Sequence, residues 1–339
     1  MNKKLYFIIA ILTLMIFSTC VSGKSERHDT RIIGEAEQFQ QQAQNKVVTQ
    51  YDTVNDSVTC YDKDNNSGTQ YNAEEDFIWI ISDDGNSVII ISYEGNNKDI
   101  RIPSQILGKP VIGIGNNAFT GINRFPDNQL NSVVIPQNVT FIGETAFAFN
   151  QLVSVIIPES VTFIGDGAFL HNRLTNIIIP ESVTSIGNMA FSNNYLTSVI
   201  IPNSVTNIGH SAFFNNQLTD IVISGSITNI KIWTFRNNKL TSVIIPDGVT
   251  FIEGGAFHDN LLTSIAIPDS VTSIGALVFD GNPLVNINIS ANVSIGGVID
   301  LTYIVYPSFP NDFDNFYESE GRRAGIYSYD SSQWSVVLK

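Results

Sequence analysis

A motif of 22 residues recurs along half of this chain and constrains its fold more than any other feature. The stretch from Leu152 to Arg173, LVSVIIPESVTFIGDGAFLHNR, returns with small changes in each repeat. A strict period of this length is typical of a solenoid, in which each repeat buries its apolar face only against its neighbours. We therefore expect an extended binding surface rather than a catalytic pocket. Leucine marks the register at Leu130, Leu152, Leu174, Leu196, Leu218, Leu240, Leu262 and Leu284, and phenylalanine keeps the same step from Phe147 to Phe279.

The chemistry of each position predicts how one coil is built. Leu-Thr-Ser-Val-Ile-Ile favours a strand, which the following Pro ends because it has no N–H for the ladder. Val-Thr-x-Ile-Gly indicates a second short extended piece, and Ala-Phe opens a turn or short helix whose Phe fills the core. An Asn two residues before each Leu is expected to be buried, since its amide can satisfy backbone groups of adjacent coils that would each cost ~1–3 kcal/mol unpaired. These structural asparagines are Asn128, Asn150, Asn172, Asn194, Asn216, Asn238, Asn260 and Asn282.

The sequence outside the repeats predicts four further segments. A basic start and an apolar run from Leu5 to Phe17, too short for a stable membrane span, indicate an export signal. A polar, Gln- and Asn-rich stretch reads as a flexible tether. Strand-like runs beginning at Phe77 and Val88 predict a hairpin over the first coil, and an aromatic-rich tail is expected to cover the last. The predicted boundaries are signal peptide 1–19, tether 20–75, N-terminal β-hairpin cap 76–102, solenoid 103–289 and C-terminal cap 290–339.

Two export routes are open. The sequence Phe17-Ser-Thr-Cys20 resembles a relaxed bacterial lipobox, in which Cys20 would be lipidated and become the mature N-terminus. Cleavage by ordinary signal peptidase after Gly23 is the alternative. The first route predicts a lipoprotein of the cell envelope or outer surface, anchored at an outer membrane by lipid, and leaves Cys60 unpaired. The second predicts a secreted protein.

Composition excludes several classes of protein. The chain has 43% hydrophobic and 15% charged residues, enough to build a large core. Its net charge of −14 opposes binding to nucleic acid or to an anionic membrane surface, so membrane attachment is expected only through the lipid. Two cysteines rule out a disulfide framework. Oligomeric state is not indicated.

A catalytic constellation is not evident. His171, His210 and His258 fall in different coils, and the first and last are four coils apart, roughly 19 Å along the stack. No nucleophile is paired with a base at a motif spacing, and no Gly-rich phosphate loop follows a strand. A solvated acidic edge explains the carboxylates that follow Pro, such as Glu159 and Glu181, better than a cation site does. We expect no enzyme activity, no cofactor and no metal.

Three features are candidates for binding, each with a structural alternative. The first is an outward strand row at Val134, Ile156, Ile178, Ile200, Val222 and Ile244, unless both faces of a narrow coil are covered. The second is the variable residue before Ile-Gly, which places exposed rings at Phe141, Phe163 and Phe251, unless the rings only pack on one another. Phe125, in an insertion before Leu130, is a further aromatic candidate.

The third candidate is the coil from Leu218 to Lys239. There Lys231 replaces the turn Gly, and Trp233 stands beside it. The eight repeats contain four basic residues, of which Lys231, Arg236 and Lys239 fall in this coil. A Trp flanked by cations on an acidic solenoid predicts a recognition site, and repeat drift is the alternative.

The repeat resembles the BspA-like, or treponemal-type, leucine-rich repeat. The resemblance rests on the motif Ile-Pro-x-Ser-Val-Thr-x-Ile-Gly-x-x-Ala-Phe, on the leader from Ile100 to Gly115, and on an end segment from Phe316 to Tyr329 similar to that of spirochaete members. It implies a β-rich leucine-rich-repeat solenoid of 22-residue coils. It also implies an exported or surface-attached protein that adheres to host proteins or other cells.

The expected function is therefore non-catalytic binding at the cell surface. The extended repeat surface would take protein or glycan ligands, with host extracellular matrix as one source. The competing hypothesis is a structural envelope protein that self-associates through the solenoid. A sugar-processing enzyme is a third hypothesis, but it needs paired carboxylates at one cleft, and the sequence shows none.

Overall fold

The computed structural model describes residues 48–52, 57–61, 74–121, 129–291, 293–298, 305–306, 313–329 and 333–338. The chain divides into two compact units, Met1–Gln70 and Tyr71–Lys339. In the first unit, strands β1 (Val48–Asp52) and β2 (Ser57–Tyr61) pair antiparallel, within the range expected to be a tether. The predicted signal peptide, Cys20, Phe125 and Asn128 lie outside the described residues.

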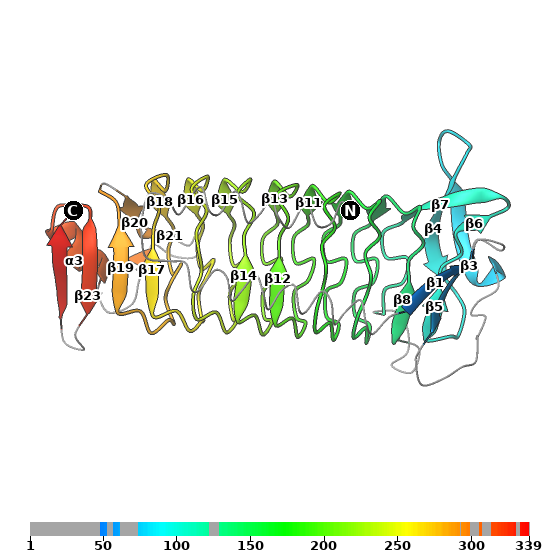
Figure 1. The fold of residues 1–339 in the computed structure, drawn as a ribbon, viewed down its shortest axis with the longest axis horizontal. Coiled ribbons are helices and arrows are strands. Elements are labelled where there is room, and N and C mark those ends of the chain that lie inside the picture. The colour runs from blue at the N-terminus through cyan, green and yellow to red at the C-terminus, as the bar shows by residue number, and fades with distance from the viewer. Residues whose placement is uncertain are drawn as a thin grey trace. The chain divides into compact units, whose positions relative to one another are not determined.

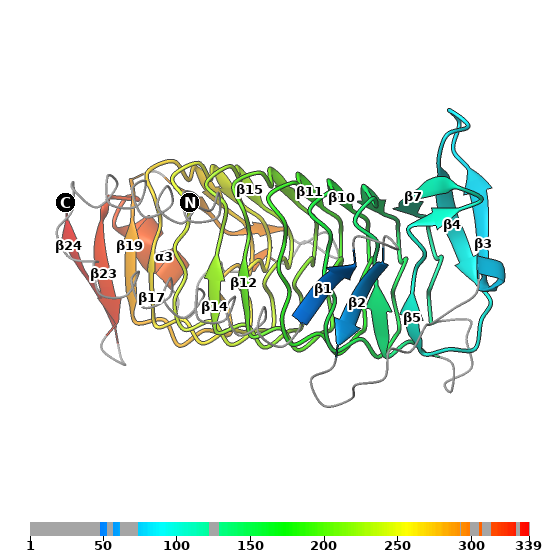
Figure 2. The same ribbon diagram turned by 45° about the vertical axis from the view of Figure 1, so that its right-hand side comes forward.

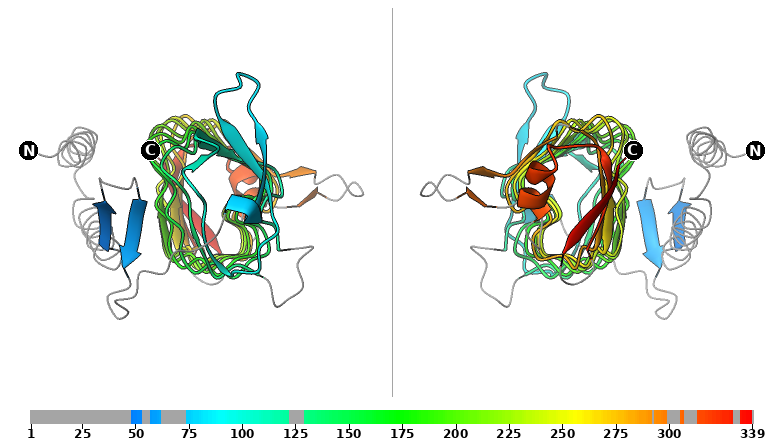
Figure 3. Two further views of the ribbon diagram at one scale, coloured as in Figure 1. Left: turned by 90° about the vertical axis from the view of Figure 1, so that its right-hand side faces the viewer. Right: turned by 90° about the vertical axis from the view of Figure 1, so that its left-hand side faces the viewer.

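The second unit is a β-solenoid, which confirms the predicted fold. Strands of neighbouring coils pair in parallel, and each residue faces its equivalent 22 positions later, as Phe141 faces Phe163 and Ser198 faces Asp220. The coils stack side by side in Figure 1, and viewed along the stack they superimpose on a common outline (Figure 3). The sequence period is thus the length of one turn.

One side of the stack carries the two-residue strands that end in Ile, here called the short-strand side. It runs along the upper edge of the coils in Figure 1. The Ile that ends each strand is buried, except Ile295 in the last strand, which is half-buried. Its strands are β7 (Lys109–Ile114), β9 (Phe141–Ile142), β10 (Phe163–Ile164), β11 (Ser185–Ile186), β13 (Asn207–Ile208), β15 (Asn229–Ile230), β16 (Phe251–Ile252), β18 (Ser273–Ile274) and β20 (Ser294–Ile295).

A second side, here called the strand face, carries the Leu-Thr-Ser-Val-Ile-Ile segments (Figure 2). Regular strands form there in some coils only. The coils that begin at Leu152, Leu174 and Leu240 have none, and their contacts include isolated bonds such as Thr175 N–H to Val153 O at 3.2 Å. The strands are β5 (Asp99–Arg101), β8 (Ser132–Val134), β12 (Ser198–Ile200), β14 (Asp220–Val222), β17 (Ser264–Ala266) and β19 (Asn286–Ile289).

The core is a column of stacked rings beside a column of amides. Eight phenylalanines from Phe119 to Phe279 stack with centroids 5.1 to 5.7 Å apart and interplanar angles of at most 15°. The described asparagines of the repeat are buried. Asn216 accepts from Leu196 N–H at 3.1 Å and donates to the carbonyls of Phe191 and Phe213 at 2.9 and 3.2 Å. Each amide therefore ties a coil to the one before it.

β-structure covers both ends of the stack. At the N-terminal end, η1 (Glu74–Asp76) leads into the antiparallel pair β3 (Phe77–Ile81) and β4 (Val88–Tyr93), with β6 (Gln105–Ile106) beside β7. At the C-terminal end, β23 (Gly325–Tyr329) and β24 (Trp334–Leu338) extend the strand face from β19. Helix α3 (Phe313–Ser319) adds Tyr317, whose hydroxyl donates to Ser290 O at 2.6 Å. The remaining pair is β21 (Gly297–Val298) with β22 (Val305–Tyr306).

The short-strand side is interrupted at the coil that contains Lys231. One sheet ends at β13 and another begins at β15. In earlier coils this position is Gly, and a Cβ on Gly209 would lie 2.3 Å from Asn188 N. Among the described bonds, neither Lys231 N–H to Ile208 O nor Thr228 N–H to Thr206 O is formed, whereas Glu253, at the equivalent position of the next coil, still donates to Ile230 O at 2.8 Å. The break is therefore particular to this coil and does not follow from the loss of Gly alone. The departure from the repeat at Lys231 thus coincides with a break in the sheet.

Candidate binding surface

The strand face exposes a row of branched apolar side chains. Ile156 is 54% exposed, while Val155 and Ile157 on either side of it are buried, so the alternation of a strand holds even where no regular strand forms. Ile178 and Ile244, at the equivalent position, are 43% and 66% exposed. The expected outward row is thus exposed at these three residues, whereas Val134, Ile200 and Val222 of the same row are half-buried, so the exposed part is not continuous.

The aromatic row of the short-strand side is divided. Phe141 and Phe163 are neighbours in register, but the ring of Phe141 lies on Gly113, where a Cβ would come within 2.2 Å of Cζ. Phe141 is half-buried and Phe163 is 43% exposed. Phe251 is exposed in a separate sheet, paired with Asn229 and Ser273. The structure thus brings Phe141 and Phe163 together and leaves Phe251 apart.

Trp233 occupies an exposed corner of its coil in a strained conformation. Its φ is 56°, in the left-handed region that a bulky side chain seldom adopts. The guanidinium of Arg236 lies 5.4 Å from the centroid of Trp233 and 5.9 Å from that of Phe214, so one cation contacts two rings. The predicted pairing of Trp233 with a cation is therefore made by Arg236.

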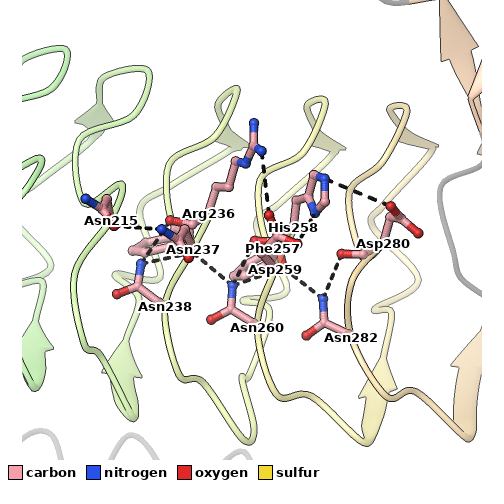
Figure 4. Close-up of polar contacts among 11 residues, drawn as sticks. Asn215, Arg236, Asn237, Asn238, Phe257, His258, Asp259, Asn260, Asp280 and Asn282 are labelled. Atoms are coloured by element: carbon pink, nitrogen blue, oxygen red, sulfur yellow. Dashed lines mark hydrogen bonds and ion pairs between the residues drawn. The ribbon is translucent and has the colours of Figure 1, made fainter.

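Arg236 is also paired with an acidic residue of the next coil. Its guanidinium lies 3.6 Å from a carboxylate oxygen of Asp259, and the ring of His258 lies between Asp259 at 3.2 Å and Asp280 at 3.9 Å (Figure 4). Because Asp259 is partly exposed, its ion pair with Arg236 adds little to stability. It partly neutralises Arg236.

The other two cations of this coil point elsewhere. Lys231 Nζ donates to Asn207 Oδ1 at 2.7 Å across the break in the short-strand side. Lys239 Nζ donates to Gln217 Oε1 at 3.0 Å, on the side of the buried asparagines. The four predicted residues of this coil therefore do not converge on one site. Only Trp233 and Arg236 are in contact.

A surface that sequence reasoning missed flanks the buried asparagines. Because each Asn side chain points inward, the residues before and after it point outward. In five successive coils these positions hold no carboxylate; they comprise two cations, three aromatic rings (one of them a histidine) and five side-chain amides. This surface, here called the turn strip, consists of Phe149, Gln151, His171, Arg173, Asn193, Tyr195, Asn215, Gln217, Asn237 and Lys239.

Contacts between coils hold the side chains of the turn strip in place. Asn237 Nδ2 donates to Asn215 Oδ1, and Asn215 Nδ2 donates to Asn193 Oδ1, both at 2.6 Å (Figure 4 shows the first). The rings of Phe149 and His171 stack with centroids 4.9 Å apart. The strip is therefore an ordered surface. Tabulating the two neighbours of each repeat Asn would have revealed it in the sequence.

The opposite electrostatic character appears at the edge that follows Pro. Glu159 and Glu181 occupy equivalent positions there in neighbouring coils. Burial raises the pKa of Glu181, and the negative charge of Glu159 raises it further. Like charges stack at this edge without a compensating cation in the described contacts.

The described residues were compared with the requirements of a metal site and of a membrane span. They contain no group of three or more His, Cys, Asp or Glu side chains that could hold a metal ion. Nor does any helix within the described ranges have the length and apolar character to cross a membrane. The feature that these residues offer is the exposed surface of the solenoid.

A solenoid of short parallel strands defines a leucine-rich-repeat scaffold when each coil buries a Leu, a Phe and an Asn, as the described repeats do. The model of the BspA type leucine-rich repeat region matches residues 114–241 and 228–298, in six copies. These ranges cover more than half of the chain. The chain belongs to this family, as its motifs indicated.

The chain is similar to solved structures of other leucine-rich repeat proteins, the first of which has the same fold. A leucine-rich repeat protein from Bacteroides ovatus is 24% identical, with a TM-score of 0.51 over 65% of this chain. The matched region spans 65% of that protein's own length. The T. pallidum leucine-rich repeat protein is 26% identical, with a TM-score of 0.48, over 62% of this chain and 89% of that one. A search of curated proteins finds no match.

Proposed function

We propose that this chain is a non-catalytic binding protein of the cell exterior that takes a protein ligand on its strand face. The observation that supports the proposal is the row of exposed Ile156, Ile178 and Ile244. Exposed apolar side chains at a fixed spacing on a rigid face form the kind of patch that marks an interaction site. Trp233 and Arg236 form a second exposed anchor, of the residue types enriched in binding hot spots.

Export is part of the proposal. The apolar run from Leu5 to Phe17 and the lipobox-like Cys20 support a lipid anchor, with residues up to about 75 as the tether. Labelling cells with a radioactive fatty acid tests the anchor. Incorporation into the intact chain and its loss in Cys20→Ala are expected. Unlabelled protein in the medium would favour cleavage after Gly23.

The binding proposal is tested by capture from host extracellular matrix. The intact chain is expected to retain a matrix protein, and a variant with Ile156→Ser and Ile178→Ser is expected to lose it. The matched control carries Ile81→Ser and Leu261→Ser, which lie elsewhere and are exposed to the same degree, at 48% and 49%. Equal capture by both variants would refute the strand face as the site.

Self-association is the competing function. It is supported by the edge strand β3, which exposes Ile78, Ile80 and Ile81 at one end of the stack. Sizing chromatography of the intact chain over a range of concentrations separates the two functions. A monomer at all concentrations favours ligand binding, whereas a concentration-dependent oligomer that Ile80→Lys abolishes favours self-association.

A further inference from the structure

The turn strip carries cations and no carboxylate, whereas the repeats as a whole carry more carboxylates than cations. The coils from Leu130 to Ile289 contain ten carboxylates and four cations, within a chain of net charge −14. None of the ten carboxylates lies on the strip, which ends where Asp259 takes the position after Asn237 in register. Arg173 and Lys239 lie on the strip, and Arg236, which borders it, is paired with Asp259. Arg173 makes no ion pair within the described part of the chain. The strip is therefore the face on which the repeats can receive an anion.

The amides of the strip are arranged so that they can form hydrogen bonds with the hydroxyl groups of a ligand. In the ladder of Asn193, Asn215 and Asn237, the middle amide uses one N–H and one oxygen lone pair. Its second N–H and second lone pair are left for a ligand, because an amide has two donors and can accept twice. A hydroxyl group both donates and accepts, so it complements each such amide. Neighbouring coils repeat this arrangement every ~4.8 Å.

The backbone conformation of the strip does not account for the aromatic residues found there. Phe149 and His171 have φ values of 59° and 52°, a left-handed conformation in which Gly or Asn costs less. Tyr195 is 50% exposed on the coil between His171 and the amide of Asn215. Flat, partly exposed rings beside amides and cations suit the apolar C–H faces of sugar rings.

We propose that the turn strip binds an extended acidic glycan, whose rings lie along successive coils and whose carboxylate or sulfate groups pair with Arg173 and Lys239. This inference rests on the proposed binding function but places a second ligand class on a different side of the coil. An acidic peptide would pair with the same cations. The row of amides favours the glycan, because hydroxyl groups recur on every sugar unit.

The first experiment measures binding of defined probes to the intact chain by calorimetry. Oligogalacturonate and a heparin oligosaccharide are expected to bind, with affinity that falls as salt is added. Methyl-esterified oligogalacturonate, which has the same sugar rings without the charge, is expected to bind at least about tenfold more weakly. Polyglutamate of equal charge represents the acidic peptide and is expected to bind weakly.

The second experiment compares two variants with the same change in net charge. Arg173→Gln with Lys239→Gln removes the cations of the strip and is expected to weaken oligogalacturonate binding by about tenfold or more. Lys98→Gln with Lys231→Gln removes two cations elsewhere and is expected to leave it unchanged. Asn237→Asp, which keeps a residue type that tolerates left-handed φ but adds a carboxylate, is expected to weaken binding as well.

Failure of this inference can be told apart from failure of the proposed function. The Ile156→Ser and Ile178→Ser variant is expected to bind oligogalacturonate normally while losing the matrix protein. The glycan proposal is overturned if neither anionic glycan binds, if the strip variant binds as the intact chain does, or if the methyl ester binds equally well. Equal or tighter binding of polyglutamate would overturn it in favour of an acidic peptide.

Discussion

The ring of Trp233 lies against Gly255 of the next coil: a Cβ on Gly255 would come within 2.5 Å of Trp233 Cδ1 and 2.8 Å of Nε1. Gly255 also has a φ of 62°, where a side chain is strained. The exposed indole of Trp233 therefore packs against Gly255 of the following coil, and it also contacts the guanidinium of Arg236. This corner is built from two coils.

Gly255→Ala is expected to displace the Trp233 ring. The clash and the left-handed backbone together should lower the free energy of unfolding by about 1–3 kcal/mol. Tryptophan fluorescence should report a more solvated indole. The matched control is Gly254→Ala, whose Cβ would have its nearest contact at 3.4 Å and which should change neither property. An unchanged emission spectrum in Gly255→Ala would contradict the proposed seating.

Substitutions at Asn216 should show that the buried amides join the coils. Asn216→Ala leaves Leu196 N–H and the carbonyls of Phe191 and Phe213 without this partner. We expect a loss of about 3 kcal/mol in chemical denaturation. Asn216→Asp keeps the acceptor but sets a carboxylate against two carbonyl oxygens, so its loss at neutral pH should be at least as large. A change below about 0.5 kcal/mol in both variants, typical of surface sites, would be inconsistent with this role.

The C-terminal cap should open in alkali. Burial raises the pKa of Tyr327 to about 12, above its ordinary value of 10.0. A raised folded pKa means that the stability contributed by the neutral phenol is complete below pH 10 and is lost as the pH rises through 12. Near-ultraviolet circular dichroism should therefore show loss of aromatic packing in this window. Tyr327→Phe loses the bond to Arg323 O at 2.6 Å, but the step assigned to Tyr327 should be absent; an unaltered step would assign it to another group.

The contact between coils at the break beside Lys231 should be the weakest on the short-strand side. Gly209 N–H is bonded to Ile186 O at 2.8 Å, whereas the equivalent bond of Lys231 N–H is not made within the described structure. Amide hydrogen exchange should therefore be faster at Lys231 than at Gly209. Lys231→Gly restores the residue that earlier coils have at this position and should slow exchange there. Equal protection of Gly209 and Lys231 in the intact chain would show that no joint exists there.

The sequence predicts the scaffold of this protein well. Leu, Phe and Asn at fixed positions must each face the core, since a coil has no other place to bury them, and register follows because identical coils pair best in step. The alternation around Ile156 could be predicted for the same reason. The same local pattern recurs in every coil, so each coil supports the interpretation of the others.

The consequences of the exceptions could not be predicted. Lys231 is visible as a departure from Gly, but so is Glu253 at the same position of the next coil, and only the coordinates show that the sheet breaks at the first and not at the second. The left-handed φ of Trp233 is likewise a property of the corner, not of the residue type. The residues of the turn strip can be found in the sequence as the two neighbours of each repeat Asn, but only the structure shows that these variable residues share one outward-facing surface.

The most direct test of the central claim is the heat capacity change on binding the captured matrix protein to the intact chain, measured by calorimetry at several temperatures. If the row of Ile156 and Ile178 is the site, the change should be clearly negative, because apolar surface is buried. In the Ile156→Ser and Ile178→Ser variant it should become less negative while affinity falls at least about tenfold. The same heat capacity change and affinity in the intact chain and the variant would contradict the account.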